Sequence, residues 1–327
     1  MNVATIPVRV ARKRVEAEGI CSFELVHADG GTLPPFTAGA HVEVHLLGGP
    51  GATGGITRPY SLCNSPGQTQ RYRIAVLRES ASRGGSAALH EGVAEGDRLE
   101  IGAPRNLFQL AEDAPSHLLL AGGIGITPLL AMAEELARRG ALFHLHYCAR
   151  SRARAAFVEQ IEQSAYADRV SLHFSDGDAA KRLDVATLLA RQQPGQHLYA
   201  CGPAGFMNAV LGAARTQGWP EATLHHEVFG ALPVDSTGDQ AFEVQLGESG
   251  RIVPVPVGCS IVAALGQAGV SIPTSCEQGI CGTCMTTVLS GTPDHRDQYL
   301  TPEEQAAGEL ILPCCSRAKS SRLVLAV

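Results

Sequence analysis

The sequence has no excess of basic residues, no uninterrupted apolar run and no internal repeat. Its 26 lysines and arginines are outnumbered by 32 aspartates and glutamates, which gives a net charge of −6. This balance argues against nucleic acid or an anionic membrane surface as a partner. Charged residues make up 18 % and hydrophobic residues 45 % of the 327 positions, a composition that excludes a disordered or fibrous chain. The length predicts two or three globular domains.

Two windows of about twenty residues or slightly more, 114–133 and 192–214, contain no charged residue, as a membrane helix would require. Prolines and glycines interrupt both windows, so each is interpreted as a buried strand, a glycine turn and a helix. The N-terminal residues show no basic segment followed by an apolar one, so no secretory signal is predicted. We therefore expect a cytoplasmic protein.

Ten cysteines are too few for a disulfide scaffold in a chain of this length, and half of them crowd into the last fifty-odd residues. Cys276, Cys281 and Cys284 have C-x4-C-x2-C spacing, and the adjacent pair Cys314 and Cys315 follows after 29 further residues. In a reducing compartment, clustered thiols indicate metal or redox chemistry. Three close cysteines and a remote fourth are typical of plant-type 2Fe–2S ligands.

The glycines between these cysteines support the same interpretation. Gly279 and Gly282 lack a Cβ, which lets backbone N–H groups approach the sulfides of a cluster. A zinc site is the alternative, but such sites usually pair two short cysteine hooks, and the second hook is absent here. No C-x-H unit exists in the chain, which argues against a Rieske centre. Four histidines on predicted strands are interpreted as surface or hydrogen-bonded residues: His144, His146, His225 and His226.

The pattern of the chain changes near residue 110. Before it, apolar and polar residues alternate at 41–46 and 72–78 between Gly/Pro-rich loops, which predicts an antiparallel barrel. After it, strand-like and helical segments alternate, which predicts a parallel sheet. The predicted strands of this sheet are 116–121, 141–148, 169–174 and 197–201. The predicted helices are 128–139, 154–164, 185–191 and 205–216.

A third region follows the polar stretch 235–240, which is interpreted as a linker. Residues 242–246 and 251–256 are predicted to form a hairpin. A helix capped by Ser260 comes next, then the cysteine loop, and 323–327 is predicted as a last strand.

Arg58, Tyr60 and Ser61 follow one another at the end of a predicted strand. A flavin needs an aromatic wall, a hydrogen-bond donor and a cation for its phosphate, and these three residue types supply them; a polar strand edge is the alternative. Further along, Gly84 and Gly85 are predicted to open a short helix, whose N–H groups would attract an anion. Together the two segments predict a site for a mononucleotide phosphate.

The segment 118–128 is interpreted as a buried strand, a glycine turn and a helix start, with Thr127 as N-cap and Pro128 as the first helical residue. A pyrophosphate would bind at that N-terminus. The G-x-G-x-x-G fingerprint is absent, so the motif supports a dinucleotide only weakly, and a tight turn is the alternative. Cys201 ends another strand at the edge where ligands gather in α/β sheets, and its thiol could contact a nicotinamide ring; a plain turn is again the alternative.

These blocks, in this order, resemble the phthalate dioxygenase reductase family, which includes the reductase subunits of vanillate demethylases. The resemblance covers nearly the whole chain and rests on RPYS at 58–61, GGS at 84–86, GGIGITP at 122–128, CGP at 201–203, EVFG at 227–230 and the cysteine set. It implies an FMN-binding β-barrel at 1–109, an NAD-binding α/β domain at 110–232, a linker at 233–240 and an α+β plant-type ferredoxin domain at 241–327. The ending LPCCSRA is similar to the segment around the family's final ligand, which selects Cys314 and leaves Cys315 as a departure.

The resemblance implies an NADH-dependent flavin iron–sulfur oxidoreductase. NADH would give a hydride to FMN, FMN would pass single electrons to the 2Fe–2S cluster, and the cluster would reduce a separate Rieske-type oxygenase in a transient complex. FMN rather than FAD follows from the domain order and the glycine–serine loop. Arginines after a strand at 150–154 could accommodate the 2′-phosphate of NADPH, but the resemblance favours NADH. Two other functions stay open: a reductase for a P450 or di-iron hydroxylase, and a carrier module that has lost catalysis.

The residues expected to act fall into four groups, three of which the resemblance assigns. The catalytic candidates are Cys201, Ser61 and Phe229. The flavin contacts are Arg58, Tyr60, Ser61, Ala75, Val76, Gly84, Gly85, Ser86 and Phe229. The NADH contacts are Gly122, Gly123, Gly125, Ile126, Thr127, Pro128, Arg150, Ser151, Cys201, Gly202 and Pro203. The cluster ligands are Cys276, Cys281, Cys284 and Cys314.

Overall fold

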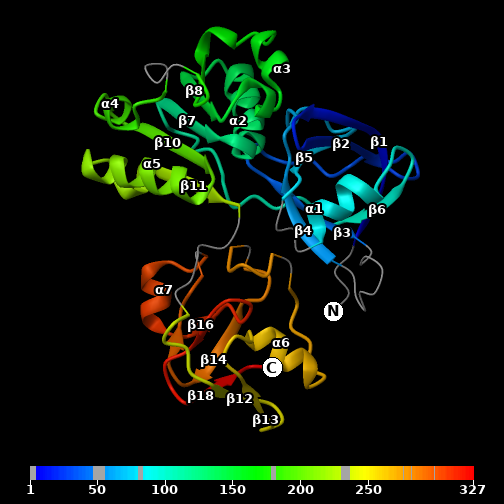
Figure 1. Cartoon of the computed structure of the whole chain (residues 1–327), viewed down its shortest axis with the longest axis vertical. Coiled ribbons are helices and arrows are strands. Elements are labelled where there is room, and N and C mark those ends of the chain that lie inside the picture. The colour runs from blue at the N-terminus through cyan, green and yellow to red at the C-terminus, as the bar shows by residue number, and fades with distance from the viewer. Residues whose placement is uncertain are drawn as a thin grey trace. The chain divides into compact units, whose positions relative to one another are not determined.

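The computed structural model describes most of the chain as two compact units, Met1–Phe229 and Gly230–Val327 (Figure 1). The described residues are 5–46, 56–79, 84–177, 182–229, 236–274, 276–280, 282–297 and 299–327. Cys281 and the first part of the predicted linker lie outside them. The first unit holds an antiparallel and a parallel sheet, and the second holds a smaller mixed sheet. The multidomain fold class predicted from the sequence is therefore confirmed.

The antiparallel sheet has six strands in the order β4-β3-β6-β1-β2-β5. The strands are β1 (Ile6–Ala17), β2 (Ile20–His27), β3 (His41–Leu46), β4 (Ile56–Ser61), β5 (Tyr72–Leu77) and β6 (Arg98–Ile101). A bridge between Leu62 and Ile74 joins the chain after β4 to β5, which closes the sheet into a barrel. Alternate residues such as Val8 and Val10 fill its interior. The glycine segment forms the helical turns α1 (Gly85–Ala87) and η1 (Ala88–Gly92), as predicted.

The parallel sheet has five strands in the order β11-β10-β7-β8-β9. The strands are β7 (Ser116–Gly122), β8 (Phe143–Ala149), β9 (Val170–Phe174), β10 (Gln196–Gly202) and β11 (Leu224–Val228). The helices are α2 (Ile126–Arg138), α3 (Val158–Glu162), α4 (Val185–Leu189) and α5 (Ala204–Thr216). Short 3-10 turns lie at Gly123–Gly125, Arg152–Arg154, Ala167–Arg169 and Glu221–Thr223. The four strands predicted for this sheet are confirmed to within two residues at each end.

Strand β7 is buried on both faces, which explains why its sequence carries no charge. Leu119 and Ala121 pack with α2 in one core, whereas Leu118 and Leu120 pack with α5 in another (Figure 1). A strand covered by helices on both sides reads as a continuous apolar run rather than an alternating one. No helix among the described residues is long and apolar enough to cross a membrane.

The helix predicted at 154–164 is wrong in its start. The structure has a 3-10 turn there and begins α3 only at Val158, because Phe157 adopts a left-handed backbone conformation with φ 63°. The Phe157 ring is buried under the guanidinium of Arg73 from the barrel, at 4.9 Å from the ring centre. This tertiary contact fixes a backbone geometry that a bulky residue rarely adopts, so helical periodicity could not predict it.

The barrel and the parallel sheet share one core. Ile20, Ala38 and Ala75 of the barrel belong to the same buried cluster as Leu119 and Ile126. This continuous packing explains why the first 229 residues form a single compact unit although they contain two sheets.

The second unit has a five-stranded sheet in the order β13-β12-β18-β14-β16 and a two-stranded sheet β15-β17. The strands are β12 (Phe242–Leu246), β13 (Ile252–Val255), β14 (Thr286–Ser290), β15 (Pro293–Asp294), β16 (Leu310–Ile311), β17 (Arg317–Ala318) and β18 (Arg322–Leu325). The helices are α6 (Ile261–Gln267) and α7 (Pro302–Ala307). The Ser260 hydroxyl accepts from the Ala263 N–H at 3.1 Å, which confirms the predicted cap of α6. Helix α7 was not predicted, although Thr301 and Glu304 form a capping box at its start.

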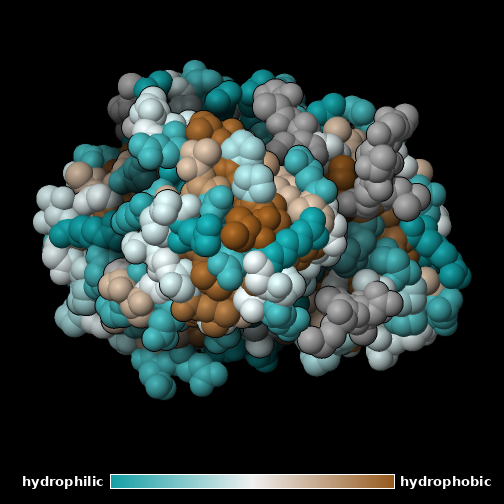
Figure 2. Space-filling view, turned by 90° about the horizontal axis from the view of Figure 1, so that it is seen from below, coloured by the Kyte–Doolittle hydropathy of each residue, from teal (hydrophilic) through white to brown (hydrophobic). Residues whose placement is uncertain are grey.

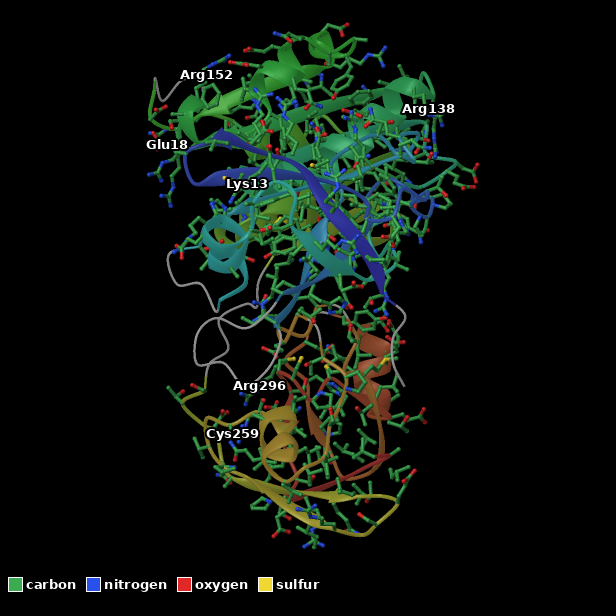
Figure 3. The ribbon with its side chains drawn as sticks, turned by 90° about the vertical axis from the view of Figure 1, so that its right-hand side faces the viewer. Lys13, Glu18, Arg138, Arg152, Cys259 and Arg296 are labelled. Carbon is green, nitrogen blue, oxygen red and sulfur yellow. The ribbon has the colours of Figure 1, made fainter. Side chains whose placement is uncertain are left out.

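Residues 236–240, interpreted from the sequence as the end of a linker, are held firmly by the second unit. The Asp239 carboxylate pairs with Arg296 at 2.5 Å and with Arg317 at 3.4 Å; Arg296 is labelled in Figure 3. Arg317 also donates to the carbonyl oxygens of Gln240 and Cys259. These three charged side chains are mostly buried, and breaking one pair would leave an unpaired buried charge.

Apolar side chains are also exposed on the second unit. Figure 2 shows such side chains gathered near the middle of the face seen from below. Among the described residues of this unit, the exposed large apolar side chains are Ile252, Val257, Met285 and Leu289. A contiguous exposed apolar patch is a feature of surfaces that contact other proteins, whereas single exposed apolar side chains are common on any surface.

We expect the first unit to lose stability as the pH falls below about 6.5. Burial lowers the pKa of His146 to about 3 and that of His225 to about 4. On acidification the histidines of the unfolded chain bind protons near pH 6.5, whereas these two folded histidines stay neutral until pH 4 or below. The free energy of unfolding is therefore highest above pH 6.5 and decreases as the pH falls below that value. Each contributes at most about 1.4 kcal/mol per pH unit, reduced by its partial exposure.

Urea unfolding followed by tryptophan fluorescence measures this, since Trp219, the only tryptophan, is buried in the first unit. Replacing His146 and His225 together by glutamine should flatten the decline between pH 6.5 and pH 4. An unchanged slope in the double variant would contradict the assignment.

Candidate functional site

The predicted flavin residues of β4 meet the glycine segment on one face of the barrel. Arg58 and Tyr60 lie two residues apart and so point to the same side of the strand. A methyl group on Gly85 would lie 2.7 Å from Cγ of Arg58 and 3.5 Å from the hydroxyl oxygen of Tyr60. Burial raises the pKa of Tyr60 to about 12, so its hydroxyl stays protonated and can donate. A cation, an aromatic ring and a glycine backbone without side chains thus lie close together.

The side chains of the other predicted flavin contacts are less accessible to a cofactor. Ala75 and Val76 on β5 are 5 % and 2 % exposed and pack into the protein core. The Val76 carbonyl lies 2.8 Å from Nε2 of His90, and the Ser86 hydroxyl accepts from the N–H of Glu79 at 3.2 Å. Ala75 and Val76 can therefore reach a cofactor only through their main chain.

Ser61 connects the barrel to the parallel sheet through a residue that sequence reasoning missed. Its hydroxyl donates to Oε2 of Glu227 at 3.1 Å. The β10–β11 register places Glu227 directly beside Cys201, and Cys201 is 0 % exposed. Two of the predicted catalytic residues, far apart in the sequence, thus converge on one buried carboxyl group. The EVFG motif contained the signal, since its first two residues end β11, the strand beside β10.

Burial sets the protonation of this group of residues. It raises the pKa of Glu227 to about 7, opposed in part by the hydrogen bond from Ser61. Burial, and secondly the Glu227 carboxylate, raise the pKa of the Cys201 thiol well above its usual value. Cys201 therefore stays a neutral thiol, whereas Glu227 can gain or lose a proton near neutral pH. Perturbed carboxyl groups of this kind cluster at functional sites.

The glycine turn after β7 packs against the end of β10. A methyl group on Gly125 would lie 2.2 Å from the carbonyl oxygen of Cys201, so only glycine fits there. Gly123 has φ +56° and nothing within 4 Å of an added Cβ, which leaves its backbone open to a ligand. The turn and the CGP segment, predicted separately from the sequence, thus lie side by side at the carboxyl edge of the sheet.

The predicted N-cap of α2 is wrong. The helix begins at Ile126, after a 3-10 turn, and its cap is Gly125. The Thr127 hydroxyl donates to the carbonyl of Ile124 at 3.0 Å instead of accepting an N–H. Pro128 is the third helical residue instead of the first, two positions further into the first turn than predicted, where its missing N–H is still without cost. The side chains of Ile126, Thr127 and Pro128 are buried, so a nucleotide would meet their backbone.

The arginines after β8 are mostly engaged. Arg152 donates to Glu162 at 2.6 and 2.8 Å, and Arg154 pairs with Glu18 at 3.2 Å; Arg152 and Glu18 are labelled in Figure 3. The main chain of Arg150 and Ser151 shapes the turn, with the Arg150 carbonyl accepting from Asp176. A 2′-phosphate would have to displace carboxylate partners from two of the three guanidinium groups.

The remaining predicted residues of this edge are exposed. Pro203 follows β10 at the surface. Phe229 comes one residue after β11 and its side chain is 41 % exposed, so its ring is accessible to a ligand.

The cysteine loop of the second unit is tightly folded. Cys276 and Cys284 are 5 % and 3 % exposed, and the Gln278 N–H donates to the Cys276 sulfur at 3.3 Å. Glu277, Gly279 and Gly282 all have positive φ values, 55°, 73° and 71°. Left-handed residues in a loop can turn its N–H groups toward one side, as a loop around an anionic cluster requires.

Both loop glycines are required by their neighbours. A methyl group on Gly279 would lie 2.4 Å from the Cys315 sulfur and 2.9 Å from Cα of Asp297. One on Gly282 would lie 2.3 Å from the Tyr299 ring. The sequence predicted glycines here so that N–H groups can approach the sulfides. The structure adds a second reason, close packing against neighbouring residues, which the cysteine spacing could not indicate.

Cys314 lies next to Cys284. A hydrogen bond with the Cys284 thiol is the main cause that lowers the pKa of Cys314 to about 3. The Cys314 sulfur raises the pKa of Cys315 in turn. The structure thus brings the remote pair to the cysteine loop, with Cys314 against Cys284 and Cys315 against Gly279.

The donor set fits a 2Fe–2S cluster. The described residues alone bring together no group of three His, Cys, Asp or Glu side chains that could hold one metal ion. Cys281, the middle thiol of the predicted set, lies outside them. The nine described cysteines form no disulfide. Buried thiols with N–H groups directed at sulfur, on a glycine-rich loop, are the environment of thiolate-held clusters.

Known families match both the nucleotide sheet and the cysteine loop. Residues 244–319 match the family described as "2Fe-2S iron-sulfur cluster binding domain". Residues 103–224 match the family described as "Dimethylamine monooxygenase subunit DmmA-like, N-terminal domain". Fold and site together define an iron–sulfur oxidoreductase with a barrel, a nucleotide sheet and a ferredoxin unit.

Individual relatives span the whole chain. It is 54 % identical to vanillate O-demethylase oxidoreductase of Pseudomonas putida over 97 % of this chain and 98 % of the relative. The structure of phthalate dioxygenase reductase matches with a TM-score of 0.77 and 39 % identity, over 99 % of this chain and 98 % of that one. An intact type IV self-sufficient cytochrome P450 monooxygenase matches with a TM-score of 0.82 and 36 % identity, over 99 % of this chain and 41 % of that one. The chain belongs to the phthalate dioxygenase reductase family.

Proposed function

We propose that this protein is the reductase component of a two-component oxygenase system of the Rieske type. It is an NADH-dependent flavin iron–sulfur oxidoreductase that carries electrons from NADH through FMN to a 2Fe–2S cluster and on to a separate oxygenase. The observation that carries the proposal is the hydrogen bond from Ser61 to Glu227, together with the strand register that places Glu227 beside Cys201. These residues join the flavin strand to the nucleotide edge.

The cofactors supply the redox chemistry, a two-electron flavin and a one-electron cluster, and the chain binds and orients them. Arg58 and the backbone of Gly84 and Gly85 would hold the flavin phosphate, while Tyr60 and Phe229 would line the ring. The turn at Gly123 would bind the NADH pyrophosphate. The proposed cluster ligands are Cys276, Cys281, Cys284 and Cys314.

Glu227 and Cys201 have distinct proposed roles. The neutral Cys201 thiol would border the nicotinamide ring without reacting covalently. The nicotinamide becomes positively charged when it gives up a hydride, and an ionised Glu227 beside Cys201 would stabilise that charge in a buried, weakly screened site. Ser61 holds the Glu227 carboxyl group in place and would face the flavin from the end of β4.

We infer the domain boundaries and location from the same features. The FMN-binding barrel would span 1–109, the NAD-binding domain 110–232, the linker 233–240 and the ferredoxin domain 241–327. The nine described cysteines form no disulfide, which suits a reducing cytoplasm. The complex with the oxygenase would be transient, because the reductase must release its partner to be reduced again.

We expect a preference for NADH over NADPH of at least about tenfold in kcat/KM. A 2′-phosphate beside β8 would meet Glu162 and Glu18, which already neutralise Arg152 and Arg154, so it gains little and meets negative charge. Replacing Glu162 by glutamine, which frees Arg152, should improve kcat/KM for NADPH while leaving that for NADH within about twofold. Glu221→Gln, which frees Arg215 in a similar exposed pair, is the control. Equal kcat/KM values for the two nucleotides in the unaltered protein would contradict the proposal.

A cytochrome P450 is the second candidate acceptor. The likeness to 41 % of a self-sufficient P450 monooxygenase over nearly the whole of this chain favours it specifically. Reduction of a purified Rieske oxygenase and of a P450 by the NADH-reduced protein, measured side by side, separates the two acceptors.

The proposal is tested most simply by an absorption spectrum before and after adding NADH, with the released flavin identified chromatographically. We expect a brown-orange protein with one FMN and about two irons per chain, bleached by NADH. A preparation that stays colourless and iron-free after reconstitution would overturn it.

A further inference from the structure

The ring of Phe206 lies against two glycines at the ends of neighbouring strands. Phe206 is the third residue of α5 and is half-buried. A methyl group on Gly122, at the end of β7, would lie 2.9 Å from Cδ1 of this ring, and one on Gly202, at the end of β10, would lie 2.7 Å from it. Both glycines are therefore required to make room for the ring.

The peptide bond between Cys201 and Gly202 is packed against side chains or backbone on both faces of the sheet. Cys201 belongs to the core that contains Ile126 of α2, and Gly125 approaches its carbonyl so closely that a Cβ would fall 2.2 Å from the oxygen. Phe206 packs on the opposite core with Leu118 and Leu120. The peptide that carries the Cys201 thiol thus has no room to shift while the ring is present.

We propose that Phe206 is a positioning residue for hydride transfer, an inference that rests on the proposed function. The hydride, with both electrons, leaves NADH to give NAD⁺ and is taken up by the flavin. Phe206 touches none of the reacting atoms in this proposal. It fixes the Cys201–Gly202 peptide and therefore the position of the Cys201 thiol beside Glu227. Small misplacements of a bound reactant cost rate more than affinity.

Stopped-flow reduction of the bound flavin by NADH tests this in the full-length protein. Phe206→Ala should lower the limiting rate at saturating NADH about tenfold, with the Kd for NADH within about twofold and the flavin spectrum and iron content unchanged. Phe206→Leu, which keeps most of the volume, should retain a rate closer to that of the unaltered protein. Leu211→Ala removes another half-buried side chain from the same core and helix and should leave the limiting rate unchanged.

A rescue experiment separates positioning from general loss of packing. In the unaltered background, Gly122→Ala places a methyl group against the ring and should slow reduction. In the Phe206→Ala background the same methyl enters the vacated space, with Pro203 still close at 3.1 Å. The double variant should therefore reduce its flavin faster than Phe206→Ala alone.

Additive losses in the double variant, a normal limiting rate in Phe206→Ala, or a loss of NADH affinity at unchanged rate would each overturn the inference. These outcomes presuppose that NADH reduces the flavin of the unaltered protein. If it does not, the proposed function itself fails, and the inference fails with it.

Discussion

Replacing Cys284 by serine is expected to remove the iron from the protein while leaving reduction of the flavin by NADH intact. Cys284 is 3 % exposed and its thiol hydrogen-bonds with Cys314. Replacing it would remove the proposed ligand that lies between the cysteine loop and the remote cysteine. The second unit has its own core, so damage there should spare the first. Electron transfer to cytochrome c should fall about a hundredfold or more, because ligand loss removes the carrier itself.

Iron content and cytochrome c reduction with NADH measure this effect. Cys259→Ser is the matched control, since Cys259 is a half-buried cysteine of the same unit outside the proposed ligand set. Iron retained at the control level in the Cys284 variant would contradict the ligand assignment.

The adjacent cysteines are distinguished by the same assay. Cys314→Ser should lose iron as Cys284→Ser does, whereas Cys315→Ser should keep it, because Cys315 packs against Gly279 and Cys314 hydrogen-bonds with Cys284. The reverse pattern would make Cys315 the ligand.

Replacing Glu227 by glutamine is expected to slow flavin reduction roughly tenfold to a hundredfold above pH 7 and to remove its dependence on pH. Burial places the pKa of Glu227 at about 7, so in the unaltered protein the carboxylate forms as the pH rises through that value. Its negative charge then stabilises the positive charge that develops on the nicotinamide, and the rate increases. Glutamine stays neutral at every pH and should reproduce the slow, low-pH rate.

Limiting rates of flavin reduction between pH 5.5 and 8.5 show this directly. Ser61→Ala is the matched comparison: the Ser61 hydrogen bond lowers the pKa of Glu227, so its removal should move the midpoint above 7. A Glu227→Gln variant with the rate and midpoint of the unaltered protein would contradict the role proposed for this carboxyl group.

Ionisation of Glu227, which should speed flavin reduction, should lower the free energy of unfolding. Between pH 4.5 and pH 7 the folded protein keeps a proton on Glu227 that the unfolded chain has released, so this residue destabilises the fold as the pH rises through that range. Glutamine should remove this contribution.

The sequence predicted those parts of the fold that depend on local pattern. The uncharged window around β7 indicated a buried strand, and Leu118 to Ala121 do pack into two cores, one on each face. The Ser260 cap and the glycine-started turn at Gly85 follow from residue types with strong local preferences. The cysteine spacing indicated a 2Fe–2S domain, which the family match over residues 244–319 confirms, because three cysteines lie within nine residues.

What the sequence could not predict depends on contacts between distant segments. Phe157 is left-handed because of Arg73, which is 84 residues away in the chain, and this displaced the predicted start of α3. Thr127 looked like an N-cap, but the 3-10 turn at Gly123–Gly125 begins the helix earlier. Glu227 escaped notice because its role depends on its register beside Cys201 and its contact with Ser61, 166 residues away.

Anaerobic addition of NADH, followed by absorption and electron paramagnetic resonance, tests the passage of electrons from flavin to cluster most directly. We predict that NADH bleaches the flavin and then produces the paramagnetic signal of a reduced 2Fe–2S cluster, at about one spin per chain. Flavin bleaching without that signal, in a sample whose cluster dithionite does reduce, would contradict it.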